Sequence, residues 1–145
     1  MIYQPCEDSY LLEKVVRKYA RGKTVLDIGS GSGIQAEAAL RGGAKSVLAV
    51  DTDNESLRFL KKKGLNAKKS DLFSALKNEK FDLIIFNPPY LQRDEREDNE
   101  SARATTGGKY GYEIVVRFLR GARKHLNSRG VILLLLSSLT PRERI

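Results

Sequence analysis

Residues 24–33 are Thr24-Val25-Leu26-Asp27-Ile28-Gly29-Ser30-Gly31-Ser32-Gly33, an apolar run that leads into three glycines at alternate positions. The apolar run predicts a buried strand, and the glycines after it predict a tight turn that a ligand can approach closely. Residues 34–40 then predict a helix, and residues 46–50 predict a second apolar strand. The order of strand, glycine turn, helix and strand is typical of an α/β fold.

The rest of the chain continues this alternation of apolar runs and amphipathic stretches. The pattern predicts an α/β fold with a mostly parallel sheet and helices on both faces. The other predicted helices are residues 7–20, 54–63 and 111–126, and the other predicted strands are residues 66–69, 81–86 and 131–136.

The last predicted strand, residues 131–136, is apolar on both faces. A strand of this kind belongs inside a sheet with a neighbour on each edge, but the chain ends within a dozen residues. We therefore expect this strand to pair with another chain, or with a terminal segment that this chain lacks.

Composition and charge limit the classes of protein. A length of 145 residues predicts a single domain covering residues 1–145. One cysteine, Cys6, and one histidine argue against a structural zinc site and a Cys/His hydrolase, and they predict no metal site. A single cysteine, with no secretory signal and no membrane-spanning run, favours the cytoplasm. The net charge of +8 favours anionic partners, although a lysine-rich solubility coat is an equal alternative.

An acid after the second strand gives the glycine turn a partner. Asp51 lies 22 residues beyond Gly29, where a carboxylate can accept hydrogen bonds from both hydroxyls of a ribose. Asp27 stands two residues before Gly29 and favours S-adenosylmethionine, whose ammonium group it could hold, or it could order the loop. The turn alone does not exclude NAD, because a permissive dinucleotide pattern starts at Gly31. A strand–helix turn without a ligand is the simpler alternative.

Residues after the weak third strand extend this predicted pocket. The Asp71 side chain could accept the amino group of adenine, and the Leu72 amide could donate to a ring nitrogen. Without the glycine turn and Asp51, Asp71 would be an ordinary surface acid.

The segment Asn87-Pro88-Pro89-Tyr90 directly follows the fourth strand, where open parallel sheets bind ligands. The prolines stiffen the turn, so that the Asn87 side-chain oxygen and the Pro88 carbonyl can each accept one hydrogen of a substrate NH2 group. These two hydrogen bonds place a poorly nucleophilic nitrogen opposite a methyl donor. Tyr90 can stack on a planar amide or base. A rigid strand-ending turn is the alternative interpretation.

These segments together resemble the class I S-adenosylmethionine-dependent amino-methyltransferases, which have a Rossmann-like fold. The closer similarity is to HemK-like release-factor glutamine N5-methyltransferases of the archaeal and eukaryotic branch. Residues 3–12, 107–113 and 135–138 carry that closer similarity. The resemblance implies catalytic roles for Asn87, Pro88 and Tyr90. It implies cofactor contacts for Ser9, Asp27, Gly29, Gly31, Asp51, Asp71, Leu72 and Asn87.

The resemblance also implies a substrate and a partner, and the chain differs from the family in one respect. The substrate would be the glutamine of the Gly-Gly-Gln segment of a translation release factor, and a small zinc-binding subunit would activate the enzyme. The family continues beyond its fifth strand into a helix and an antiparallel hairpin, so we expect this domain to be C-terminally short. Two alternatives stay open, namely an adenine or guanine amino-methyltransferase of nucleic acid and an inactive cofactor-binding module.

Overall fold

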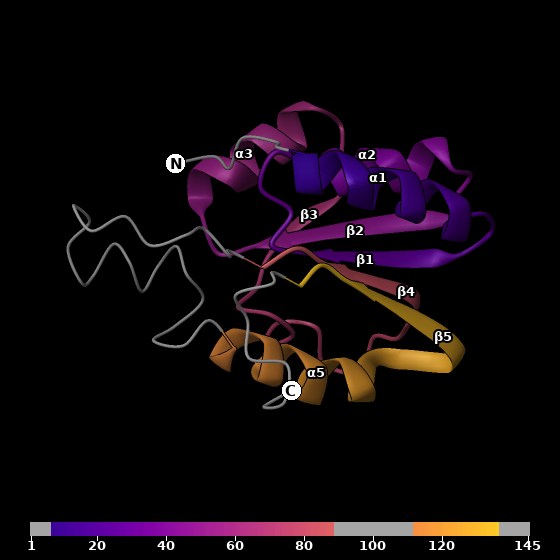
Figure 1. Cartoon of the computed structure of the whole chain (residues 1–145). Helices are drawn as coiled ribbons and strands as arrows, with labels where there is room; N and C mark the ends of the chain where they lie inside the picture. The colour runs from indigo at the N-terminus through magenta and orange to yellow at the C-terminus, as the bar shows by residue number, and fades with distance from the viewer. Residues whose placement is uncertain (1–6, 89–111, 137–145) are drawn as a thin grey trace.

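Five strands in the order β3-β2-β1-β4-β5 form one parallel sheet (Figure 1). The computed structural model describes residues 7–88 and 112–136. The strands are β1 Thr24–Ile28, β2 Ser46–Asp51, β3 Ala67–Lys69, β4 Phe81–Phe86 and β5 Leu126–Leu134. The parallel order brings the carboxyl ends of all strands to one edge, which is where ligands bind in such sheets.

Helices cover both faces of the sheet, with α1, α2 and α3 on one side and α5 on the other (Figure 1). Leu12 and Val16 of α1 pack with Ala36 of α2 on the first face. Phe118 of α5 packs with Phe73 on the second face. The helices are α1 Glu7–Tyr19, α2 Ile34–Arg41, α3 Asn54–Lys62 and α5 Glu113–His125. The predicted α/β fold with a parallel sheet is confirmed, and none of the helices in the described ranges is long and apolar enough to cross a membrane.

The last strand differs from its prediction. It begins at Leu126, directly after α5, whereas the sequence predicted residues 131–136. Residues 127–130 are polar and therefore resemble a turn, yet the Asn127 side chain donates to Asp82 Oδ1 at 3.0 Å and holds this segment beside β4. A register shift between Phe81 and Leu83 accommodates the extra residues.

The outer edge of β5 tests the expectation that this strand has a second neighbour. Within the described residues, β5 pairs with β4 and with no second strand. Val131 is exposed, and Ile132, Leu133 and Leu134 are half-buried. The predicted second neighbour is therefore not among residues 7–88 and 112–136.

Asp82 ties three strands together at the end of the sheet opposite the ligand edge. Its carboxylate accepts from the backbone and hydroxyl of Thr24, both at 2.9 Å, and from Asn127. These hydrogen bonds hold the Asp82 pKa below its ordinary value, with the Thr24 backbone bond contributing most. The stabilisation is therefore present above the ordinary pKa of an aspartate and is lost as pH falls through the lowered pKa.

We expect Asp82→Asn to lower the free energy of unfolding by about 1–2 kcal/mol at pH 7, because charge-assisted hydrogen bonds are replaced by weaker ones. Urea unfolding at pH 7 and at pH 3.5 measures the effect. The difference between the two proteins should shrink at the lower pH, and a difference that does not change with pH would contradict this role of the carboxylate.

Candidate cofactor and substrate site

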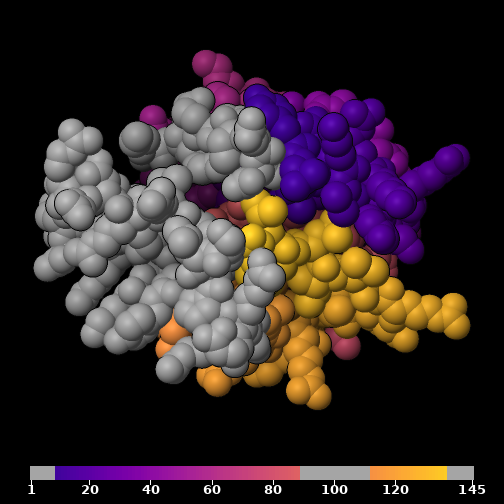
Figure 2. All heavy atoms as spheres, viewed as in Figure 1, coloured from indigo at the N-terminus to yellow at the C-terminus, as the bar shows by residue number. Residues whose placement is uncertain are grey.

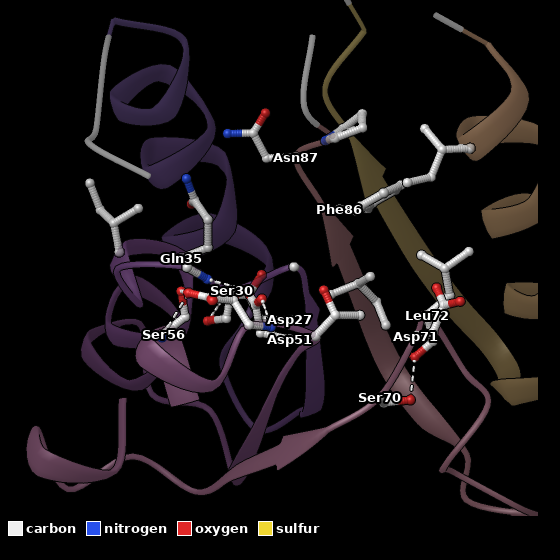
Figure 3. A pocket seen from close by; sticks show the side chains of 18 residues that line it. Asp27, Ser30, Gln35, Asp51, Ser56, Ser70, Asp71, Leu72, Phe86 and Asn87 are labelled. Atoms are coloured by element: carbon white, nitrogen blue, oxygen red, sulfur yellow. Dashed lines mark hydrogen bonds between the residues drawn. The ribbon is translucent and has the colours of Figure 1, made fainter. Parts of the chain in front are cut away.

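A cavity of about 360 Å³ opens at the carboxyl ends of the strands (Figure 3). Its size lies in the range of small-molecule sites. It is lined by residues 27–31, 51–53, 70–72 and 86–88, together with Ile34, Gln35, Ser56 and Ile114. The structure thus brings together every predicted site residue except Ser9, which does not line the cavity, and Tyr90, which lies outside the described residues.

The glycine turn has the backbone that the sequence predicted. Gly29 has φ +64° and Gly33 has φ +84°, in the region that glycine adopts without strain. A Cβ atom on Gly33 would lie 2.8 Å from Leu60 Cδ2 and 2.9 Å from Leu65 Cδ1. Gly33 is therefore required for close packing of the start of α2 against α3, in addition to its backbone conformation.

Asp51 is held in place by the glycine turn itself. The Gly31 N–H donates to Asp51 Oδ2 and the Asp53 N–H donates to Oδ1, each at 2.9 Å. Each carboxylate oxygen has a further lone pair, so both can still accept from a ligand. The geometry is compatible with the predicted contact to two ribose hydroxyls.

We expect Asp51→Ala to raise the dissociation constant of S-adenosylmethionine about 10- to 100-fold, because the ribose hydroxyls would lose their acceptor. Isothermal titration calorimetry measures this constant. Glu37→Ala is the matched control, since it removes an acid of α2 that does not line the cavity. Equal affinity in the Asp51 variant and the control would contradict the ribose role.

Asp27 is a buried acid at the base of the cavity, and it is 2% exposed. Burial raises the pKa of Asp27 to about 7, against the opposing effect of the Ser30 hydroxyl, which donates to Oδ2 at 2.7 Å. The contact with Ser30 shows that Asp27 orders the glycine turn. It does not exclude the other predicted role, since Oδ1 also has lone pairs.

The far side of the cavity is built from the turn after β3 (Figure 3). Leu72 has φ +53°, a left-handed conformation that is uncommon for leucine, and the Ser70 hydroxyl donates to its carbonyl at 2.8 Å. Asp71 Oδ2 forms an exposed ion pair with Arg117 of α5 at 3.2 Å. The sequence did not reveal this partner, because 46 residues separate the two. The adenine contacts of Asp71 and Leu72 stay predictions.

Asn87 follows β4 and lies at the end of the cavity away from Asp71 (Figure 3). Its Nδ2 donates to Ser9 Oγ at 3.3 Å, so its Oδ1 is directed elsewhere and can accept. Ser9 is fully buried, and its carbonyl also accepts from Gln35 Nε2 at 2.9 Å. In this geometry Ser9 positions Asn87 from α1, and its predicted contact with the cofactor stays a prediction.

Comparison with known proteins places these features in a family context. Residues 7–145 match the model of the methyltransferase small domain. The chain is 39% identical over 150 aligned residues to a Methanocaldococcus jannaschii protein assigned as an N5-glutamine methyltransferase, covering 96% of this chain and 74% of that relative. It is 35% identical to the release factor glutamine methyltransferase of Rhodopirellula baltica, covering 79% of this chain but only 44% of that relative.

A solved structure shows a similar fold. A 16S rRNA N2 methyltransferase of T. thermophilus, solved with AdoMet and guanosine, has a TM-score of 0.71 and 25% identity. The match covers 97% of this chain and 37% of that one. This chain therefore spans little more than a third of the length of that protein.

Proposed function

Because the chain belongs to the methyltransferase small domain family, as its resemblance predicted, we propose that it is an S-adenosylmethionine-dependent N-methyltransferase acting on a planar NH2 group. The observation that carries this proposal is the position of Asn87 at the end of the cavity, with Nδ2 bonded to Ser9 and Oδ1 available as an acceptor. Pro88 lines the cavity beside it and is buried.

The cavity fits the proposed cofactor. Asp51 is held with acceptors available for a ribose, and Asp27 is a buried carboxylate that suits a cationic group. Gln35 adds a buried oxygen that has no hydrogen-bond partner in the described part of the chain. When bound, S-adenosylmethionine supplies a methyl group on a positively charged sulfur, which is electrophilic.

The residues after β4 prepare the nitrogen of the substrate. An amide nitrogen is a weak nucleophile because its lone pair is delocalised. Asn87 Oδ1 and the Pro88 carbonyl each accept one of its two hydrogens, so they fix its direction and stabilise the positive charge that develops on it. No strong general base is required, because the proton can leave after methylation. Tyr90, which lies outside the described residues, is proposed to stack on the amide plane.

The substrate we propose is the glutamine of the Gly-Gly-Gln segment of a translation release factor. The M. jannaschii relative is assigned to N5-glutamine methylation and the R. baltica relative to release factors, which supports this choice. A small zinc-binding activator subunit is a proposed partner, and it would cover the half-buried apolar side chains of β5. The proposed location is the cytoplasm, where release factors act.

Amino-methylation of a nucleic-acid base is the second candidate. The T. thermophilus neighbour solved with guanosine and the net charge of +8 favour it. Base flipping requires a recognition surface in addition to the pocket for the base. The relatives assigned to glutamine methylation favour the first candidate over this one. An inactive cofactor-binding module is the third candidate, and the same experiment separates all three.

Mass spectrometry of a purified release factor tests the proposal after incubation with this protein and S-adenosylmethionine. We expect one added methyl group on the Gly-Gly-Gln glutamine and none when that glutamine is replaced by alanine. Methylation of ribosomal RNA in a parallel reaction, without methylation of the release factor, would favour the second candidate. Cofactor binding without any transfer would favour the third.

A further inference from the structure

Gln35, in the first turn of α2, carries a buried oxygen whose purpose the fold does not explain. The side chain is 3% exposed and lines the cavity. Its Nε2 donates to the Ser9 carbonyl at 2.9 Å. Because a carbonyl can only accept, this bond fixes the orientation of the amide and directs Oε1 away from Ser9.

Gln35 Oε1 has no hydrogen-bond partner within residues 7–88 and 112–136. Buried acceptors in native proteins are nearly always paired, so an orphaned oxygen calls for a donor that the described residues do not supply. Ser32 Oγ is also buried and unpaired in the described ranges, but Ser32 does not line the cavity. The two side chains therefore differ in whether they line the cavity.

The neighbours of Gln35 indicate the chemistry of the missing donor. In Figure 3, Gln35 lies between Asn87 and the group formed by Asp27 and Ser30. Asp27 is an acceptor when ionised, and its Oδ2 already accepts from Ser30. A primary ammonium group has three hydrogens and no acceptor, so a buried one needs several acceptors around it. A carboxylate would be repelled by Asp27 and could not donate to Gln35.

We propose that Gln35 Oε1 accepts a hydrogen bond from the ammonium group of S-adenosylmethionine, beside Asp27. The inference rests on the proposed cofactor and assigns Gln35 as a residue that selects for its amino-acid end. It also gives the Ser9 carbonyl a function, which is to hold the Gln35 amide in the orientation that presents its oxygen.

Calorimetry with two ligands tests the assignment without any methyl transfer. The first is S-adenosylhomocysteine, and the second is the same molecule without its amine, 5′-S-(3-carboxypropyl)-5′-thioadenosine. We expect Gln35→Met to raise the dissociation constant of the first at least about 10-fold, the cost of one hydrogen bond to a charged group, and to leave the second within about two-fold. Glu37→Ala is the control, since Glu37 also lies in α2 but does not line the cavity, and it should change neither.

A second variant guards against a folding defect. Gln35→Glu loses the donor to Ser9 but keeps an acceptor in place, so it should retain the preference for the ligand with the amine. Equal weakening of both ligands by Gln35→Met, no weakening of either, or loss of the preference in Gln35→Glu would overturn the inference. If the unchanged protein binds neither ligand, the proposed function itself fails.

Discussion

Asn87→Ala should slow methyl transfer about 100- to 1,000-fold and leave the dissociation constant of S-adenosylmethionine within about three-fold of its original value. The amide oxygen of Asn87 orients the substrate nitrogen and stabilises the charge that develops on it, and such contacts are worth this much in rate. Asn87 lies at one end of the cavity, so its loss leaves the contacts of Asp51 intact. A single-turnover assay measures the rate, and calorimetry measures the affinity.

Two further variants make the Asn87 experiment specific. Asn66→Ala removes an exposed asparagine that does not line the cavity, so both rate and affinity should stay unchanged. Ser9→Ala removes the hydroxyl that accepts from Asn87 Nδ2, so it should reduce the rate less than Asn87→Ala does. A parallel loss of affinity and rate in Asn87→Ala would show that the residue supports the cofactor and does not hold the substrate.

The sequence predicted those parts of the fold that depend on local chemistry. The glycine turn was predictable because Gly29 and Gly33 adopt left-handed conformations that other residues resist. The buried strands β1 and β4 were predictable because each is a short, mainly apolar run, interrupted only by single polar residues. The start of β5 was not, because residues 127–130 are held by Asp82, a partner 45 residues away.

The site shows the same division between local and distant contacts. Asp27, Asp51 and Asn87 could be placed at one edge, because each lies at or directly after the carboxyl end of a strand of a parallel sheet. The contact between Ser9 and Asn87 spans 78 residues and joins α1 to the end of β4, which no local pattern reveals. Gln35 gave one weak signal, a polar residue between Ile34 and Ala36 at the start of α2.

The buried carboxyl of Asp27 should make cofactor binding depend on pH. Burial raises its pKa to about 7, so between about pH 4 and pH 7 the folded protein holds a proton that the unfolded chain has lost. The contribution of Asp27 to stability therefore falls as pH rises through this window. A cationic ligand beside Asp27 favours the ionised carboxylate over the protonated form. Binding of such a ligand below pH 7 should therefore release a proton.

If Asp27 pairs with the ammonium group, the dissociation constant of S-adenosylhomocysteine should rise about 20-fold between pH 7.5 and pH 5.5. Calorimetry in two buffers of different ionisation enthalpy should show nearly one proton released at pH 6. Asp27→Asn should bind more weakly and without this dependence, and the ligand that lacks the amine should not weaken as pH falls. A constant affinity over this range would mean that Asp27 serves only to order the glycine turn through Ser30, because a carboxyl that met the cation could not keep its proton in the complex.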